Sequence, residues 1–439
     1  LLEFLAKSLG ALAVAAALAW DVEDVEEQCA ALAGRQQFLR PAGIAEWPDG
    51  TRAARYGFLH ALYQQLWHER VSVSQLQRWH LRIGERKEAA YGKRKDEIAT
   101  ELAVHFEQGR DYQRAVQYLH LAGENAIRRS AHREAISLLT KGPELLKALP
   151  DTPDRAQQEL MLHVTLGVPL QAIRSYASPE VQATYTRVRE LCQQVGETRQ
   201  LFPALLGLRR FHLVRGEFLM GRELGEQLLG LAQKERDPAL LMEAYWGLGS
   251  IFFFLGEFST AQAHLEQGMT LYDAQRHHSH VFLYGIEPGV SGLCNVAFVL
   301  WHLGYPDQAL QKSAAACTLA HEPAPPCSLA AARVLAAMTH QLRRDRALTH
   351  EWAEATITLA REQGFSVWIG LGAVLQGWAL ADQGQSEEGM SQIHQGLAAR
   401  QAIGAGIFQS YNLALLAEAY GKAGQVEEGL TALTEALAV

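Results

Sequence analysis

The sequence has few cysteines and none of the short motifs that mark common enzyme active sites. Its five cysteines lie far apart in 439 residues, without a CxxC pair, so neither a disulfide framework nor a zinc site is expected. The absence of GxxxxGK[ST], GxSxG and HExxH excludes a phosphate-binding P-loop, a nucleophile elbow and a zincin helix. We therefore expect no catalytic residue, metal or cofactor in this chain, and we interpret it as non-enzymatic.

The chain also has only a modest excess of negative charge and no long uninterrupted apolar run. The formal net charge of -8, with 20% charged residues, gives no bulk attraction for nucleic acid or an anionic membrane. The apolar run from Leu1 to Trp20 is interrupted by Glu3 and Lys7 and has no basic leader, so we interpret it as buried helix rather than a signal peptide. The scattered thiols indicate a reducing, cytoplasmic location. Because the chain begins in mid-pattern without methionine, we expect a fragment of a longer protein.

In place of catalytic motifs the sequence has a repeat. The stretch LGEFSTAQAHLEQG, which begins at Leu255, returns in altered form along the second half of the chain. Each copy opens on a turn glycine, and these glycines are Gly216, Gly256, Gly304, Gly384 and Gly424. Their spacing is 40 residues or twice 40, except for one step that is 8 longer, and a degenerate copy surrounds Arg344. A fixed period of this length is typical of a solenoid of helical hairpins.

Small residues recur 12 positions apart across the turns. The pairs are Ala103 with Ala115, Gly249 with Ala261, Ala297 with Ala309, Gly377 with Gly389 and Ala417 with Gly429. Antiparallel helices approach closely only where both carry small side chains, so each pair marks the contact within one hairpin. We predict a mainly α protein with a winged-helix-like module at residues 1–95, followed by a right-handed α-solenoid of tetratricopeptide-like hairpins. Its first repeats, partly irregular, span 96–198, and repeats with a period of about 40 residues span 199–439.

The first 95 residues show two helices followed by a hairpin. Helical sequence covers Ala11–Ala19 and the acidic stretch after it, and short strands at Gln37–Arg40 and Ala54–Leu59 flank a turn rich in Pro, Gly and Asp. This order predicts a winged helix. Its second helix opens with the carboxylates of Asp21, Glu23, Asp24, Glu26 and Glu27. Because they would face DNA phosphates, we expect no nucleic-acid partner; a basic run from Arg78 to Lys95 keeps DNA binding as the weaker alternative.

Two motifs after the hairpin carry a family resemblance. F-L-H-x-L from Phe58 and W-H-x-x-I-G from Trp79, with the acidic helix and hairpin, resemble the winged-helix module of the STAND signalling ATPases. The chain is also similar to the C-terminal half of large bacterial proteins that join a class III adenylate or guanylate cyclase domain, an AAA-type ATPase and a helical array. The resemblance implies that His60 contacts the β-phosphate of ADP in an upstream ATPase domain in cis. ATP or ADP and Mg²⁺ would belong to that missing domain. The alternative for His60 is a histidine at a helix start, bonded to backbone groups.

Ligand-binding candidates lie on the first helices of the hairpins, which line the concave side of a solenoid. Aromatic residues at three- to four-residue spacing usually pack in the core, so we select the less regular ones as a strip for a protein or peptide partner. These residues are Arg209, Arg210, His212, Trp246 and Trp301. The long repeat step contains His277, His278 and His280. These histidines could belong either to a metal site or to a solvated loop. No fourth ligand is suitably spaced, so we expect a solvated loop.

The sequence favours the regulatory or sensor portion of a STAND-type signalling ATPase. In this hypothesis the array binds a protein, peptide or small ligand and controls a nucleotide-binding or cyclase output domain that the chain lacks. A constitutive tetratricopeptide scaffold that gathers protein partners without a switch is the first alternative. A DNA-binding transcription regulator is the second. We expect a protein or peptide partner, and neither nucleic acid nor a membrane.

Overall fold

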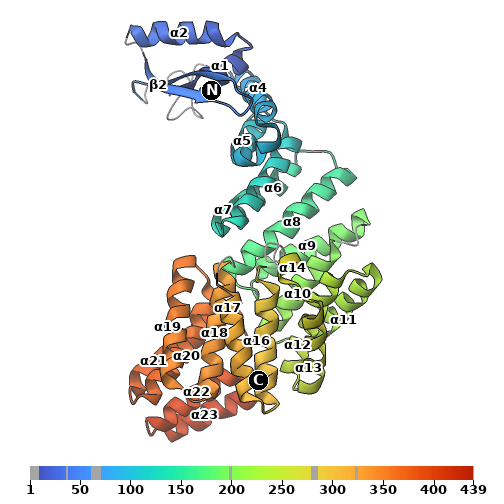
Figure 1. The fold of residues 1–439 in the computed structure, drawn as a ribbon, viewed down its shortest axis with the longest axis vertical. Helices are drawn as coiled ribbons and strands as arrows, with labels where there is room; N and C mark the ends of the chain where they lie inside the picture. Colours follow the sequence, from blue (N-terminus) through green and yellow to red (C-terminus); the bar gives the residue numbers. More distant parts are fainter. Residues whose placement is uncertain are drawn as a thin grey trace. The chain divides into compact units, whose positions relative to one another are not determined.

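The computed structural model describes residues 9–35, 38–60, 71–196, 200–277, 285–321 and 325–438. Within these ranges the chain folds into two compact units. Unit 1 comprises Leu1–Asn125 and Ser137–Leu162, and unit 2 comprises Ala126–Ile136 and His163–Val439. Most elements are helices, and in unit 2 they follow one another as hairpins (Figure 1). Every helix in the described part of the chain is too short or too polar to cross a bilayer.

Unit 1 begins with a small module of two helices and a sheet. Its elements are β1 (Leu9–Gly10), α1 (Ala11–Leu18), α2 (Val22–Gly34), β2 (Leu39–Glu46) and β3 (Arg52–Phe58). The strands are antiparallel in the order β1-β3-β2. The apolar helix α1 packs against β3 and α4, which confirms that this part of the opening apolar run is buried helix. Helices α1 and α2 followed by the β2–β3 hairpin form the predicted winged-helix-like module.

The acidic start of α2 and the basic run further on form bonds within unit 1. Asp21 caps α2 by accepting a hydrogen bond from the Glu23 backbone N–H at 2.9 Å. In the basic run, Arg86 Nη1 lies 2.8 Å from Asp49 Oδ2, and Lys87 Nζ lies 2.6 Å from Glu101 Oε1. These basic groups therefore join parts of the unit to one another.

The hairpin differs from the prediction in the length of its first strand. We expected a strand ending at Arg40, but β2 continues to Glu46 through a shift of register between Pro41 and Ile44. The prediction was wrong because we took Pro41 and Gly43 as parts of a turn. On an edge strand, proline removes no essential ladder bond, and Gly43 supplies the φ of +100° of a bulge.

Helices complete unit 1 and begin the array. They are α4 (Val73–Tyr91), the 3-10 helix η1 (Gly92–Ile98), α5 (Ala99–Gln108), α6 (Tyr112–Arg128), α7 (His132–Leu146) and α8 (Pro153–Arg174). Each of the last three has residues in both units. The predicted border at residue 95 falls inside η1, and the one at 198 lies outside the described residues. Both borders stay predictions.

The rest of unit 2 is the predicted α-solenoid of tetratricopeptide-like hairpins. Its helices are α9 (Pro179–Val195), α10 (Leu201–Arg215), α11 (Phe218–Glu235), α12 (Pro238–Phe254), α13 (Phe258–Leu271), α14 (Ala274–His277), α16 (Pro288–His302), α17 (Pro306–Leu319), α18 (Pro326–Leu342), α19 (Arg346–Gln363), α20 (Ser366–Asp382), α21 (Ser386–Ala402), α22 (Gln409–Lys422) and α23 (Val426–Ala438). The first helices of the hairpins, α10, α12, α16, α18, α20 and α22, each pack against the next first helix. This stacking gives the array one continuous inner wall.

The turn glycines take the left-handed backbone conformation that the repeat pattern predicts. The φ values are +82° at Gly216, +78° at Gly256, +87° at Gly304, +91° at Gly384 and +75° at Gly424. Glycine is favoured there because a Cβ is strained at positive φ. The degenerate repeat keeps the same turn with an arginine, since Arg344 has a φ of +63°.

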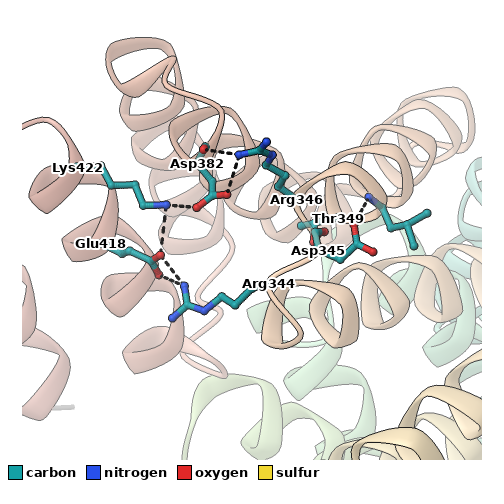
Figure 2. Close-up of polar contacts among 8 residues, drawn as sticks. Arg344, Asp345, Arg346, Thr349, Asp382, Glu418 and Lys422 are labelled. Atoms are coloured by element: carbon teal, nitrogen blue, oxygen red, sulfur yellow. Dashed lines mark hydrogen bonds and ion pairs between the residues drawn. The ribbon is translucent and has the colours of Figure 1, made fainter.

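The side chain of Arg344 connects this turn to later repeats. Its Nη1 lies 2.5 Å from Glu418 Oε1 on α22, and Lys422 lies 3.6 Å from the same carboxylate oxygen. Lys422 also pairs with Asp382 at the end of α20, which lies 3.8 Å from Arg346 (Figure 2). A network of surface ion pairs therefore joins Arg344 to α22 and, through Lys422, to the end of α20.

At two of the five predicted pairs, the structure shows that the small residues lie at a close contact between helices. A Cβ added to Gly377 would lie 2.5 Å from the carbonyl oxygen of Gly389, the residue paired with it in sequence. A Cβ on Gly249 would lie 3.2 Å from the carbonyl oxygen of Ala261 and closer still to Leu265. At these points the backbones of the two helices nearly touch, and side chains interlock on either side.

We expect Gly377→Ala to destabilise unit 2 by about 1 to 3 kcal/mol, because the new methyl group overlaps backbone that cannot move alone. The matched control is Gly230→Ala on α11, where a Cβ meets nothing within 4 Å. That change should stabilise the helix by roughly 0.5 to 1 kcal/mol. Urea denaturation measures both, and equal midpoints for the two variants would disprove the contact at Gly377.

Candidate ligand-binding cavity

Unit 2 contains a cavity of about 180 Å³ on the inner side of its first helices. Residues of α10, α12, α16, α18 and α20 form most of its wall, joined by Arg400 of α21 and the segment before α22. Several of these helices are apolar on nearly all sides, as expected for helices packed on both faces. An adjoining groove of about 460 Å³ shares Phe253, Phe254, Phe298 and Phe408 with the cavity.

Most of the wall is apolar and aromatic. The aromatic lining residues are Tyr176, Trp246, Phe253, Phe254, Phe298, Trp368 and Phe408. Phe253 lies in the middle of this group, with ring centroids 5.9 Å from Phe298 and 5.0 Å from Phe254. Concave, aromatic walls with a few polar groups are the usual form of a small-molecule or peptide site.

Arg209 of α10 is a buried cation in this wall. Its side chain is 5% exposed, and its Nη1 donates to the Gly247 carbonyl oxygen at 3.2 Å and to Ser250 Oγ at 3.3 Å. Its Nε has no hydrogen-bond partner among the described residues. Burial, with a contribution from the neighbouring Arg210, lowers the pKa of Arg209 to about 9. The guanidinium is therefore still charged at neutral pH.

Arg400 of α21 is a second buried cation, 2% exposed. Its Nη2 donates to the carbonyl oxygen of Ile407, and its Nε likewise lacks a partner within the described ranges. Burial lowers the pKa of Arg400 to about 10. A buried charge is costly unless hydrogen bonds and an opposite charge compensate it.

The charged groups of the wall do not balance. Glu243 of α12 is buried, and its Oε2 lies 3.9 Å from Nη2 of Arg210. The charged lining residues are three arginines and this one glutamate, which leaves an excess of two positive charges. This local excess contrasts with the net charge of -8 of the chain.

A short connection closes the cavity on one side. We call Ile403–Phe408, which joins α21 to α22, the strap. Its Ile407 N–H donates to the Val214 carbonyl oxygen of α10 at 2.9 Å. Gly406 lies so close to Arg215 that an added Cβ would be 2.3 Å from the Arg215 carbonyl oxygen. The strap therefore connects the last repeats to the end of α10.

Phe408 ends the strap in a strained conformation. Its φ is +60°, and its ring centroid lies 5.1 Å from that of Phe254 and 6.0 Å from that of Phe298. The left-handed conformation costs a non-glycine residue roughly 1 to 2 kcal/mol. The ring contacts with the cavity wall offset part of that cost.

The structure brings three of the five predicted binding residues to the cavity. Arg209, Arg210 and Trp246 line it. Trp246 is also a packing residue, because its indole fills the space beside Gly268 and Gly292. His212 and Trp301 are not among the lining residues; His212 Nδ1 instead pairs with Glu217 Oε2 at 2.5 Å.

Several lining residues were not among those selected. Trp368 belongs to the aromatic residues of the first helices that we set aside as core residues. Glu243 also lies on a first helix, but it does not stand out in a sequence rich in acids. Arg400 was missed because it lies on a second helix, which we expected to face outward. Phe408 and the strap carry a faint signal, the glycines Gly404 and Gly406 in one short linker.

The two predicted histidines that the structure describes, His60 and His277, are not among the residues that line the cavity. His60 is exposed directly after β3, and residues 61–70, which would follow it, lie outside the described residues. His278 and His280 also lie outside them. His277 was expected in a solvated loop, but it is 6% exposed, and its Nδ1 accepts a hydrogen bond from the Asp273 backbone N–H at 3.1 Å. Packing against Tyr272 explains its burial. In the described part of the chain, no three His, Cys, Asp or Glu side chains are grouped to hold a metal.

No protein-family model matches the chain. A curated relative is an uncharacterised protein of Rhizobium meliloti (strain 1021), 24% identical over 389 residues. The match covers 87% of this chain and 37% of that protein, so the chain spans little more than a third of its relative's length.

Solved structures similar to this chain include Rap proteins. A Rap protein complexed with Competence and Sporulation Factor has a TM-score of 0.53 at 9% identity, over 73% of this chain and 96% of that one. The Rap conjugation gene regulator of the plasmid pLS20, in complex with the Phr* peptide, has a TM-score of 0.54 at 12% identity, over 78% and 88%. These similarities confirm the helical-repeat fold.

We expect Gly406→Ala to loosen the strap, because its new Cβ would overlap the backbone of Arg215. The Ile407 amide, which bonds to Val214, should then exchange its hydrogen about tenfold faster, the effect of roughly 1.4 kcal/mol of local stability. Gly421→Ala on α22 is the control, since a Cβ there meets nothing within 4 Å. Unchanged protection at Ile407 in Gly406→Ala would show that this contact does not hold the strap.

Proposed function

We propose that this chain is the sensor portion of a signalling protein and that the inner cavity of unit 2 binds its ligand, a peptide or small molecule. The observation that carries the proposal is the cavity itself, in which first helices far apart in sequence bring aromatic rings and buried charged groups together. The chain's part in signalling would be binding without catalysis, since it lacks the motifs of the enzyme classes considered above.

The similar solved structures support the peptide version of the proposal. The Rap structures are described as complexes with Competence and Sporulation Factor and with the Phr* peptide. A shared fold does not transfer a ligand, because binding residues are particular to each protein. It shows that arrays of this architecture accommodate a second molecule, and the cavity supplies a place for one here.

The cavity binds a neutral aromatic probe if this proposal is right. N-phenyl-1-naphthylamine, whose fluorescence rises in apolar surroundings, should bind the chain, and Asn295→Trp should weaken that binding by about tenfold or more. Asn295 lines the cavity from α16 and is only half-buried, so an indole there takes up ligand space with little effect on the core.

Gln311→Trp on the neighbouring helix α17 is the matched control, because Gln311 is exposed and outside the cavity lining. It should bind the probe as the unmodified chain does. A wild-type chain that binds the probe no better than Asn295→Trp contradicts the proposal.

We further propose, from the sequence resemblance, that the array acts on a STAND-type ATPase domain, fused in some family members to a cyclase. The winged-helix-like module would hold that domain closed through His60, whose exposed position after β3 leaves it accessible to a nucleotide domain. ATP or ADP with Mg²⁺ would bind to the upstream domain in the cytoplasm, and ligand binding to the array would release it. The much longer curated relative is consistent with such a multidomain protein.

His60→Ala in the full-length protein tests this coupling. We expect faster ADP release and higher basal output, because the closed state loses one of its contacts to the nucleotide. His60→Gln, which keeps a hydrogen-bonding side chain, should have a smaller effect. Unaltered ADP retention together with unaltered basal output in His60→Ala would refute the role of His60.

A further inference from the structure

The cavity contains two buried arginines, and the acidic residues that line it are too few to balance the positive charge of its wall. Arg209 and Arg400 come from α10 and α21, more than one hundred residues apart in sequence, and both line the same cavity. Each is at least nine-tenths buried, and the Nε of each is without a hydrogen-bond partner among the described residues. Buried N–H donors that lack a partner are rare because they lose their hydration without replacement.

Hydrogen bonds that hold the fold together use only some of the N–H groups of each guanidinium. Arg209 Nη1 bonds to Gly247 and Ser250 of α12, which fixes α10 to the next first helix. Arg400 Nη2 bonds to Ile407, which holds the strap. Neutral donors would make these bonds at a lower desolvation cost, so the bonds do not explain why charged groups stand there.

The nearby acid does not neutralise the arginines. Glu243 is the one acidic residue among those that line the cavity, and it lies beside Arg210. The charge of Glu243 also acts on Arg209, but one carboxylate balances only one of the three guanidinium groups, so two positive charges stay in excess. Guanidinium groups bind carboxylates strongly in such desolvated surroundings, with parallel N–H donors to two oxygens.

We propose that Arg209 and Arg400 bind a carboxylate on an otherwise apolar ligand in this cavity. The inference rests on the proposed function, that the cavity binds a ligand, and adds the chemical class of that ligand. The aromatic wall, with Phe253, Phe298 and Trp368, receives the apolar part. A peptide with a free C-terminus or acidic side chain and a small aromatic acid share this chemistry.

Two fluorescent probes with one skeleton separate charge from shape. 8-Anilinonaphthalene-1-sulfonate carries a negative group, and N-phenyl-1-naphthylamine is the same molecule without it. We expect the chain to bind the anionic probe at least about tenfold more tightly. 4-Phenylbutyrate should displace it, and 4-phenylbutanamide should not, because only the first has a carboxylate.

Substitutions then test whether the two arginines cause the preference for the anionic probe. Arg209→Met and Arg400→Met should each reduce the affinity for the anionic probe by about tenfold while the neutral probe binds as before. Arg400→Lys keeps the charge and should retain most of the preference. Arg361→Met, at an exposed position of α19, is the control and should change neither affinity. Loss of an arginine with a purely structural role would change the affinity for both probes together. The ratio of the two affinities is therefore the decisive measurement.

The source of the carboxylate is tested with mixed hexapeptides that have either free or amidated C-termini. Displacement by the free form alone indicates a peptide C-terminus, equal displacement by both indicates an acidic side chain, and displacement by phenylbutyrate alone indicates a small acid. Equal affinity of the wild-type chain for the two probes overturns the carboxylate site. If the neutral probe is then still excluded by Asn295→Trp, the proposed cavity function stands. Failure of both probes to bind the wild-type chain overturns both.

Discussion

The arrangement of unit 2 depends on the close approach of helices at small residues. At Gly377 and Gly389, and again at Gly370 and Gly396, the backbones come so near that a single methyl group would meet a carbonyl oxygen of the facing helix. This approach lets larger side chains interlock around the contact and gives each hairpin a defined geometry. Because the contact recurs with the repeat, consecutive first helices stack, and their inner faces become one wall.

A stacked wall alone is an open surface, and the strap converts part of it into a cavity. The strap depends on the close contact of Gly406 with Arg215 and on the Ile407–Val214 hydrogen bond. Its last residue, Phe408, keeps an unfavourable φ while its ring packs on the wall. Local strain of this kind persists where the surrounding structure holds it, and it is common beside functional sites. Ile407 and Phe408 of the strap therefore form part of the cavity wall.

The cavity also contains side chains whose burial lowers the stability of unit 2. Arg209 and Arg400 are charged groups in an apolar core, in a chain that is acidic as a whole. Apolar residues of similar volume would fill the same space at lower free energy. Such a cost is typical of a binding site, where polar groups are kept for a ligand rather than for the fold. The Rap structures share the helical-repeat architecture with this chain.

The sequence by itself determined the repeat, because turn glycines and small residues impose local requirements that appear at fixed spacing. Even the degenerate copy at Arg344 keeps the left-handed turn. The sequence also placed Arg209, Arg210 and Trp246 on the inner wall, since first helices line a solenoid. It did not distinguish His212 and Trp301 from them, because the phase of a helix that is apolar on most sides is not visible in its pattern.

Only the tertiary structure brought Arg400 and Phe408 to the same cavity as Arg209. Their proximity comes from contacts between segments nearly two hundred residues apart, which no local period encodes. The extent of β2 and the burial of His277 were likewise decided by their neighbours, an edge position in one case and Tyr272 in the other. Spacing thus fixes the scaffold through short-range geometry, whereas the chemistry of the cavity depends on which distant side chains the closed array buries together.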